Sequence, residues 1–112
     1  MVNDFEGRNA IITGGGSGIG FEIAKQLLVG NIDNVVLIGR NGEKLQRAKT
    51  NLGSQYDEKI RTLSLDVSDT ENMLNVLNDY LTNLPFKIDI LVNNAGVMCQ
   101  QLFPLITEDE FD

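Results

Sequence analysis

Hydrophobic positions along the chain follow two different periods, which alternate from one segment to the next. Apolar runs predict four short strands, at residues 9–13, 35–38, 60–65 and 88–92. Between these runs, apolar residues recur every three or four positions, which is typical of one face of a helix. Strands that alternate with helices form parallel sheets with right-handed crossovers, so the pattern predicts an α/β fold.

Cap and turn residues set the limits of the three predicted helices. The first helix follows a run of glycines and stops at Gly30, and the second begins at an Asn41 cap and stops at Gly53. The third begins with a capping box at residues 68–71, where Ser and Glu side chains can bond free amides of the first turn. It ends before Pro85, because proline cannot continue a helix.

Composition and charge narrow the range of partners. The chain has 9 Lys and Arg against 16 Asp and Glu, a formal net charge of −7, whereas binding to a nucleic-acid backbone draws on dense basic residues. Its single cysteine, Cys99, cannot form an internal disulfide, suits a reducing compartment and, without an activating base, is expected to pack rather than react. The sequence shows neither a signal-peptide pattern nor an apolar run of about 18 residues. We therefore expect a cytoplasmic protein with no nucleic-acid partner, no membrane partner and no metal site.

The glycine-rich segment from Gly14 to Gly20 lies where the first predicted strand turns into a helix. Glycine accepts positive φ in a tight turn, and without a Cβ the backbone can approach a pyrophosphate. The free amides of the following helix would then face the phosphates. The spacing is G-x-x-x-G-x-G, which matches neither G-x-G-x-x-G nor a P-loop. The segment predicts a dinucleotide site, and a glycine turn that binds nothing is the alternative.

The end of the second predicted strand bears on the choice of coenzyme. An acid at this point holds the ribose hydroxyls of NAD, whereas an arginine accommodates the 2′-phosphate of NADP. The chain has Gly39-Arg40-Asn41 there and no acid. A guanidinium can bind a phosphate bidentately, and a carboxylate would repel it. Arg40 therefore favours NADP(H) over NAD(H), unless it is a solvated surface arginine.

Three motifs occur in order along the chain: T-G-x-x-x-G-I-G at residues 13–20, Asp-Val at 66–67, and Asn-Asn-Ala-Gly at 93–96. Together they resemble the short-chain dehydrogenase/reductase family, over about residues 7–112. The stretch at residues 37–45 is similar to NADP-preferring members. The resemblance implies a doubly wound parallel sheet of Rossmann type and a nicotinamide dinucleotide as the ligand.

The resemblance also implies a role for each matching residue. Gly14, Ser17, Gly18 and Ile19 would surround the pyrophosphate, and Gly20 would let the helix pack closely. Arg40 would meet the 2′-phosphate, Asp66 would accept a hydrogen bond from the adenine amino group, and Val67 would pack on the ring. In the last motif, Asn93, Ala95 and Gly96 would line the ribose and nicotinamide. The implied coenzyme-binding residues are Gly14, Ser17, Gly18, Ile19, Gly20, Arg40, Asp66, Val67, Asn93, Ala95 and Gly96.

Some of these residues have plain structural alternatives, and one family feature is missing. Asp66 could be a helix-entry carboxylate near the Ser68 cap, and Asn93 with Asn94 could form a turn. NADP-preferring relatives often carry a basic residue inside the glycine loop, where this chain has Gly-Gly-Ser at 15–17. Coenzyme preference therefore depends on Arg40 alone.

The family's catalytic residues, an Asn on the next helix, a Ser and a Tyr-x-x-x-Lys pair, have no counterpart in the chain. Tyr56 has its lysine one position too early, and Tyr80 has none. The chain also has no histidine that could replace them. Reduction of a carbonyl through the coenzyme needs a proton donor beside it. We therefore assign no catalytic residue and expect the 112-residue chain to be inactive alone.

We interpret residues 1–112 as a partial NAD(P)-binding Rossmann domain, truncated after the fourth strand, with strand order 3-2-1-4. A second capping box, at residues 107–110, predicts a further helix at the end of the chain. The longer parent would transfer hydride between NADP(H) and a small carbonyl or alcohol, and it could be a homo-oligomer.

Two other hypotheses stay open. The chain could be a non-catalytic nucleotide-binding or interaction fragment, such as a shortened isoform. A methyltransferase also uses a glycine-rich turn after its first strand. That hypothesis is disfavoured, because a methyltransferase would need an acid where this chain has Gly39 and Arg40.

Overall fold

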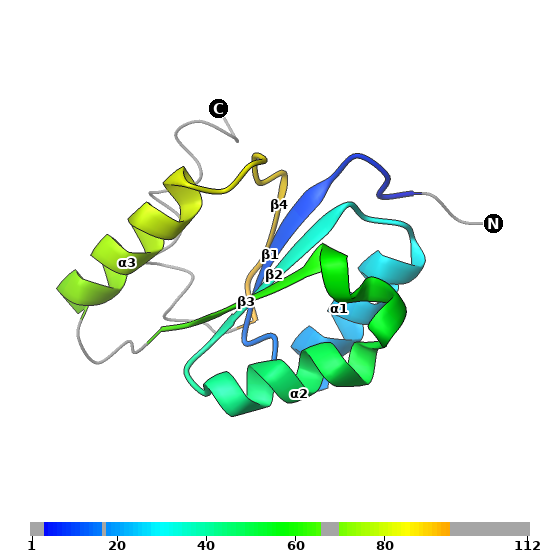
Figure 1. The fold of residues 1–112 in the computed structure, drawn as a ribbon, viewed down its shortest axis with the longest axis horizontal. Helices are drawn as coiled ribbons and strands as arrows, with labels where there is room; N and C mark the ends of the chain where they lie inside the picture. Colours follow the sequence, from blue (N-terminus) through cyan, green and yellow to red (C-terminus); the bar gives the residue numbers. More distant parts are fainter. Residues whose placement is uncertain (1–3, 17, 66–69, 95–112) are drawn as a thin grey trace.

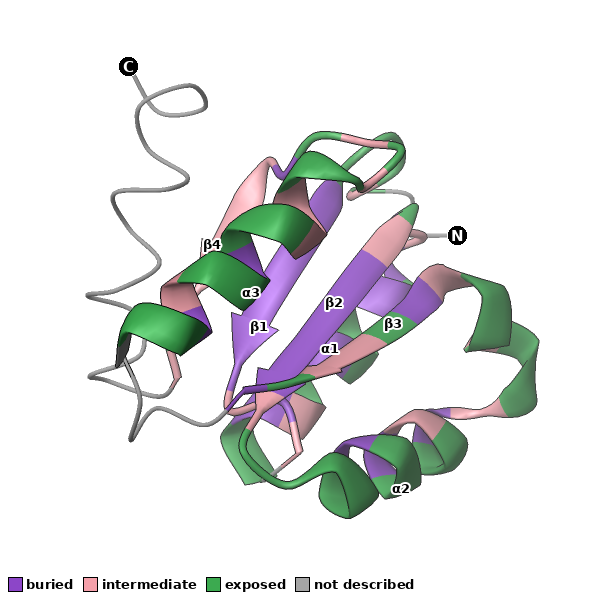
Figure 2. Ribbon diagram, turned by 60° about the vertical axis from the view of Figure 1, so that its left-hand side comes forward, coloured by how far each residue is buried: buried purple, intermediate pink, exposed green. Residues whose placement is uncertain are grey.

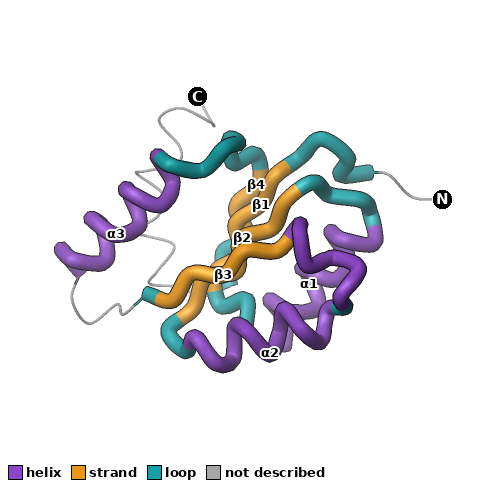
Figure 3. Tube along the Cα trace, in the orientation of Figure 1, coloured by secondary structure: helices purple, strands orange, loops and turns teal. Residues whose placement is uncertain are grey.

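In the described part of the chain, four parallel strands form one sheet, with helices on both of its faces (Figures 1 and 3). The computed structural model describes residues 4–16, 18–65 and 70–94. The strands are β1 (Asn9–Thr13), β2 (Asn34–Gly39), β3 (Ile60–Ser64) and β4 (Ile90–Val92). Their order in the sheet is β3-β2-β1-β4. The predicted α/β class, the parallel pairing and the strand order are confirmed.

The helices begin and end close to the predicted caps. They are α1 (Gly18–Val29), α2 (Gly42–Leu52) and α3 (Thr70–Thr82), and a short 3-10 helix, η1 (Ser54–Lys59), precedes β3. The Oδ1 of Asn41 accepts a hydrogen bond from the Lys44 amide at 3.1 Å, which confirms the predicted N-cap. At the other end of α2, Gly53 has a φ of 120° and its amide donates to Thr50 O. The predicted capping boxes at 68–71 and 107–110 involve residues outside the described part.

Two hydrophobic clusters fill the two sides of the sheet. On one side, Ala10, Ile12 and Leu37 pack against α1 and α2. On the other, Ile11 and Val36 pack with α3. Because successive side chains of a strand point to opposite faces, both layers draw on the same apolar runs. Each fully buried aliphatic side chain contributes about 1.5–3 kcal/mol, and Figure 2 shows β1 and β2 buried almost throughout.

The prediction for the fourth strand was wrong at its start. The strand begins at Ile90 rather than Ile88, because its pairing with β1 begins where Ala10 faces Ile90. A regular strand over residues 88–92 would place Ile88, Ile90 and Val92 on one face. Ile88 instead packs on the α3 side, while Ile90 and Val92 pack on the side of α1 and α2. The regular alternation of side chains between the two faces of the sheet therefore does not extend back to Ile88.

Candidate nucleotide-binding site

The glycine segment forms the turn from β1 into α1 at the carboxyl edge of the sheet, where parallel α/β sheets bind their ligands. Gly14 has a φ of +68°, so the predicted positive-φ glycine is present. The amides of Gly14 and Gly15 donate to Ile38 O at 2.7 and 3.3 Å. These bonds fix the start of the turn against the end of β2. The amides that follow, at the start of α1, belong to the first turn of a helix and have no acceptors within it.

Gly20 and Gly18 lie in opposite surroundings. A Cβ at Gly20 would overlap the carbonyl oxygen of Gly14 and come within 3.0 Å of Asn94 Nδ2. A Cβ at Gly18 would meet nothing within 4 Å. Gly20 therefore lets α1 pack on the turn, and Gly18 leaves open space beside the first amides of the helix. A pyrophosphate must approach the backbone amides closely in order to bind them, and the open space beside Gly18 permits that approach.

Asn94 joins the end of β4 to the glycine turn, a role that the sequence analysis missed. Its backbone amide donates to Thr13 Oγ1 at 3.0 Å, and its side-chain Nδ2 donates to Gly14 O at 3.2 Å. Thr13 Oγ1 in turn donates to Val92 O at 3.3 Å. The sequence did contain a signal for this contact. The predicted strand order makes the first and fourth strands neighbours, so the residues that follow these two strands should lie close together. Asn94 therefore holds the glycine turn in position through these bonds.

Arg40 follows the last residue of β2 and its side chain is exposed. Its carbonyl oxygen accepts a hydrogen bond from Ser64 Oγ at 3.0 Å, and Leu65 donates its amide to Gly39 O at 2.9 Å. The backbone at this point is therefore fixed by the end of β3, while the guanidinium faces solvent at the carboxyl edge. That position is compatible with a phosphate contact.

The remaining predicted residues fall into two groups. Ile19 is 69% exposed at the start of α1, and Asn93 is exposed just after β4. Both lie at the carboxyl edge with the glycine turn. The other predicted residues lie outside the described part of the chain: Ser17, Asp66, Val67, Ala95 and Gly96.

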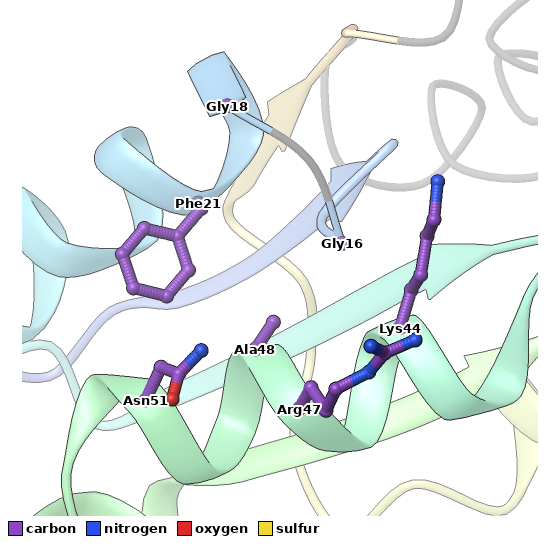
Figure 4. A pocket seen from close by; sticks show the side chains of 7 residues that line it. All are labelled: Gly16, Gly18, Phe21, Lys44, Arg47, Ala48 and Asn51. Atoms are coloured by element: carbon purple, nitrogen blue, oxygen red, sulfur yellow. The ribbon is translucent and has the colours of Figure 1, made fainter.

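A groove of about 350 Å³ opens between α1 and α2, next to the glycine turn (Figure 4). Its lining residues are Gly16, Gly18, Phe21, Lys44, Arg47, Ala48 and Asn51. Of these, the sequence analysis had named Gly18 alone as a site residue. The missed signal was the spacing of Lys44, Arg47 and Asn51, which places them on one stripe of α2 beside its apolar face.

Two further features bear on the chemistry of the described part of the chain. It contains no group of three or more His, Cys, Asp or Glu side chains that could hold a metal ion. No helix in it is both long and apolar enough to cross a bilayer.

Comparison with known proteins identifies the family. A family model described as short chain dehydrogenase matches residues 8–112. The chain therefore belongs to the short-chain dehydrogenase family, which confirms the resemblance and excludes the methyltransferase hypothesis.

Curated relatives are much longer than this chain. It is 43% identical over 90 residues to salutaridine reductase of Papaver somniferum, covering 80% of this chain and 29% of that protein. It is 37% identical over 108 residues to the 3-oxoacyl-acyl-carrier-protein reductase FabG of Chlamydia trachomatis, covering 93% of this chain and 41% of that protein. The chain thus spans well under half the length of these two relatives.

Solved structures show the same fold. The menthone neomenthol reductase of Mentha piperita has a TM-score of 0.69 at 38% identity, over 80% of this chain and 31% of that one. The L-sorbose reductase of Gluconobacter frateurii has a TM-score of 0.79 over 96% of this chain and 49% of that one. The second is 23% identical, so it speaks for the fold alone.

Proposed function

We propose that residues 1–112 form the NADP(H)-binding part of an oxidoreductase that transfers hydride between the coenzyme and a carbonyl or alcohol. The observation that carries the proposal is the glycine turn. Gly14 has the positive φ of the turn, Gly20 lets α1 pack against it, and Gly18 leaves room beside the first amides of α1. When bound, the coenzyme would supply the hydride, and this chain would hold its phosphates and adenosine.

Each predicted residue keeps its role in this proposal. Gly14, Gly18, Ile19 and Ser17 would surround the pyrophosphate, whose charge the positive end of α1 stabilises. Asp66 and Val67 would hold the adenine. Asn93, Ala95 and Gly96 would line the ribose and nicotinamide. Asn94 adds a positioning role, because it holds the end of β4 on the turn at 3.2 Å from Gly14 O.

We further propose NADP(H) as the preferred coenzyme. Family membership alone does not decide between NADP(H) and NAD(H), because the similar solved structures include the C-domain of a bacterial malonyl-CoA reductase with NADP and a xylitol dehydrogenase bound to NAD⁺. Arg40 supports the choice, because it stands exposed at the carboxyl edge where an NAD-binding chain would carry an acid. A guanidinium at that point attracts a 2′-phosphate.

The chemical step needs residues that we do not find in this chain. Tyr56 packs against the cluster beneath α1 and α2, and Tyr80 packs against the cluster beneath α3. Burial raises the pKa of Tyr80, against the opposing effect of the nearby Arg61 charge. Neither tyrosine is therefore a suitable proton donor at the carboxyl edge. We propose that the 112 residues bind coenzyme without turning over substrate. If the chain acts as it stands, a non-catalytic nucleotide-binding module is the second candidate.

The Gly18→Val substitution tests the proposal. The new side chain would project into open space, so the fold should survive, yet it would block approach to the first amides of α1. We expect NADPH affinity, measured by isothermal titration calorimetry, to fall at least about tenfold, or 1.4 kcal/mol. Lys25→Val, an exposed change in the same helix, is the matched control and should leave affinity unchanged. Equal NADPH affinity in both variants would contradict a phosphate site at this turn.

A further inference from the structure

One outer edge of the sheet is formed by β3. Among the described strands it pairs with β2 alone, at the end of the order β3-β2-β1-β4 (Figures 1 and 3). The central positions of β2 are buried, whereas β3 is buried at Ile60 and partly or fully exposed from Arg61 to Ser64 (Figure 2). A strand in this position presents a row of unpaired amides and carbonyls to a further strand.

The pairing with β2 shows which backbone groups of β3 face outwards. The amide of Leu65, directly after β3, donates to the carbonyl of the last residue of β2 at 2.9 Å. Successive residues of a strand direct their backbone groups alternately to its two sides. Arg61 and Leu63 therefore also face β2. Thr62 and Ser64 direct their amides and carbonyls away from the sheet.

β3 lacks the features that commonly protect an edge strand, which are a proline, a bulge or a charged side chain across the edge. It contains no proline, and its register with β2 runs from Ile60 to Ser64 without a bulge. Its one charged residue, Arg61, lies with its guanidinium carbon 5.4 Å from the centroid of the Phe86 ring. Phe86 packs against the cluster beneath α3, so the charge is held on that side of the sheet.

The side chain of Thr62 is held on the opposite side of the sheet. Its Oγ1 accepts a hydrogen bond from Gln46 Nε2 of α2 at 2.9 Å. The side chains of Arg61 and Thr62 are thus both bound to other parts of the chain, one on each face. Neither of them covers the outward amides of β3.

The sequence of β3 is compatible with antiparallel pairing to itself. With Thr62 opposite the same residue of a second copy, the five residues of each strand overlap fully. Arg61 then lies opposite Leu63 of the other copy, so like charges do not face each other. Pairs of threonines across antiparallel strands are themselves favourable. Moving the centre of the pairing toward either end of β3 would shorten the overlap.

We propose that two copies of this chain pair through β3, as antiparallel strands related by a two-fold axis at Thr62. The amide of Thr62 in each copy would donate to the Thr62 carbonyl of the other, as in a hydrogen-bonded antiparallel pair. The two sheets would then form one continuous sheet. The same strand serves both copies, so the contact closes after two chains. This surface lies at the opposite edge of the sheet from β4.

Amide hydrogen exchange, measured by NMR in dilute and in concentrated solution, tests this pairing directly. We expect the amides of Thr62 and Ser64 to exchange at least about tenfold more slowly in the concentrated solution. Arg61 and Leu63 are the internal control, because their amides already pair with β2 and should change much less. Fast exchange of the Thr62 amide at every concentration would overturn the proposal, even if the chain associates through β4.

Substitutions of Thr62 separate backbone pairing from the effects of its side chain. Thr62→Pro removes the outward amide, a change that an edge strand tolerates where the N–H faces solvent. Thr62→Lys places like charges opposite each other at the two-fold axis. We expect sedimentation equilibrium to show at least about tenfold weaker dimerisation for both variants. Added salt should restore part of the loss for the lysine variant alone.

The matched control is Thr62→Val, which keeps the amide and the β-branched shape and should dimerise as the unmutated chain does. Urea unfolding checks that each variant keeps the fold, and Thr62→Lys keeps the test valid if the proline variant does not fold, since lysine is common on edge strands. A chain that stays monomeric, or a dimer that neither proline nor lysine weakens, would overturn the proposal. An equal loss in the valine variant would also overturn it, because the side chain rather than the amide would then hold the copies together.

Discussion

Replacing Gly20 with alanine should destabilise the junction of β1 and α1, whereas the same change at Gly18 should not. The added methyl group at Gly20 would overlap the carbonyl oxygen of Gly14 and crowd Asn94 Nδ2 at 3.0 Å. At Gly18 it would meet nothing within 4 Å. Both changes exchange glycine for alanine in the same helix, so their gains in helix propensity, at most about 1 kcal/mol each, largely cancel.

The difference between the two variants therefore measures the clash. Forcing a methyl group into closely packed surroundings costs about 1–3 kcal/mol. We expect the free energy of unfolding of G20A to be lower than that of G18A by this amount. A typical domain has a net stability of about 5–15 kcal/mol, so G20A should still fold. Its coenzyme affinity should fall as well, because the Gly14 turn must move away from Asn94.

Urea unfolding followed by far-UV circular dichroism measures this difference. The two variants should show the same dependence on urea concentration and different midpoints, because the clash changes stability and not the surface exposed on unfolding. Equal midpoints would refute the argument that α1 packs on the turn through Gly20. A G18A variant as unstable as G20A would refute the open space at Gly18.

Three other features give separate tests. Asn94→Leu removes the bond to Gly14 O and should lower the free energy of unfolding by about 0.5–1.5 kcal/mol; an unchanged urea midpoint would show that this bond does not hold the turn. Burial raises the pKa of Tyr80 above 10.0 despite the opposing Arg61 charge, so its contribution to stability is present below pH 10 and is lost as the pH rises through the raised pKa. The urea midpoint should therefore fall with pH above about 10 more steeply in the unmutated chain than in Tyr80→Phe, and parallel profiles would contradict this. Among the described strands β4 pairs with β1 alone, and its three residues are partly exposed, so the chain should self-associate in sedimentation experiments; a monomer at high concentration with slow amide exchange in β4 would argue against it.

The strands and helices were predictable from the sequence because they follow from local features. Each strand is an apolar run, and each crossover contains an amphipathic helix with a recognisable stop. The Asn41 cap was equally local, since its acceptor and the Lys44 amide are three residues apart. The family motifs then supplied the order of the strands in the sheet.

Register was less predictable, because it depends on contacts between distant segments. The start of the fourth strand is fixed by Asn9, whose amide donates to Asp89 Oδ2 at 2.9 Å and whose carbonyl oxygen accepts from the Asp89 amide at 2.8 Å. Regular pairing begins one residue later, which places Ile88 on the opposite side from Ile90. An apolar run alone does not show where pairing starts.

The missed site residues depend on packing in three dimensions. The bond from Asn94 to Gly14 joins residues 80 apart in the chain. The groove lies where the glycine turn, at Gly16, approaches Lys44 of α2. Gly16 was predicted only as part of the turn, and Lys44 only as part of the stretch at residues 37–45, because a contact between two distant segments leaves no periodic pattern in the sequence.

The titration that tests the central claim most directly compares NADPH and NADH on the unmutated chain and on Arg40→Asp. We predict that the unmutated chain binds NADPH at least about tenfold more tightly than NADH. The variant should reverse this preference, because its carboxylate repels the 2′-phosphate and can hold the ribose hydroxyls of NADH. Equal affinities in the unmutated chain, or no loss of NADPH binding in the variant, would contradict an NADP(H) site at this edge of the sheet.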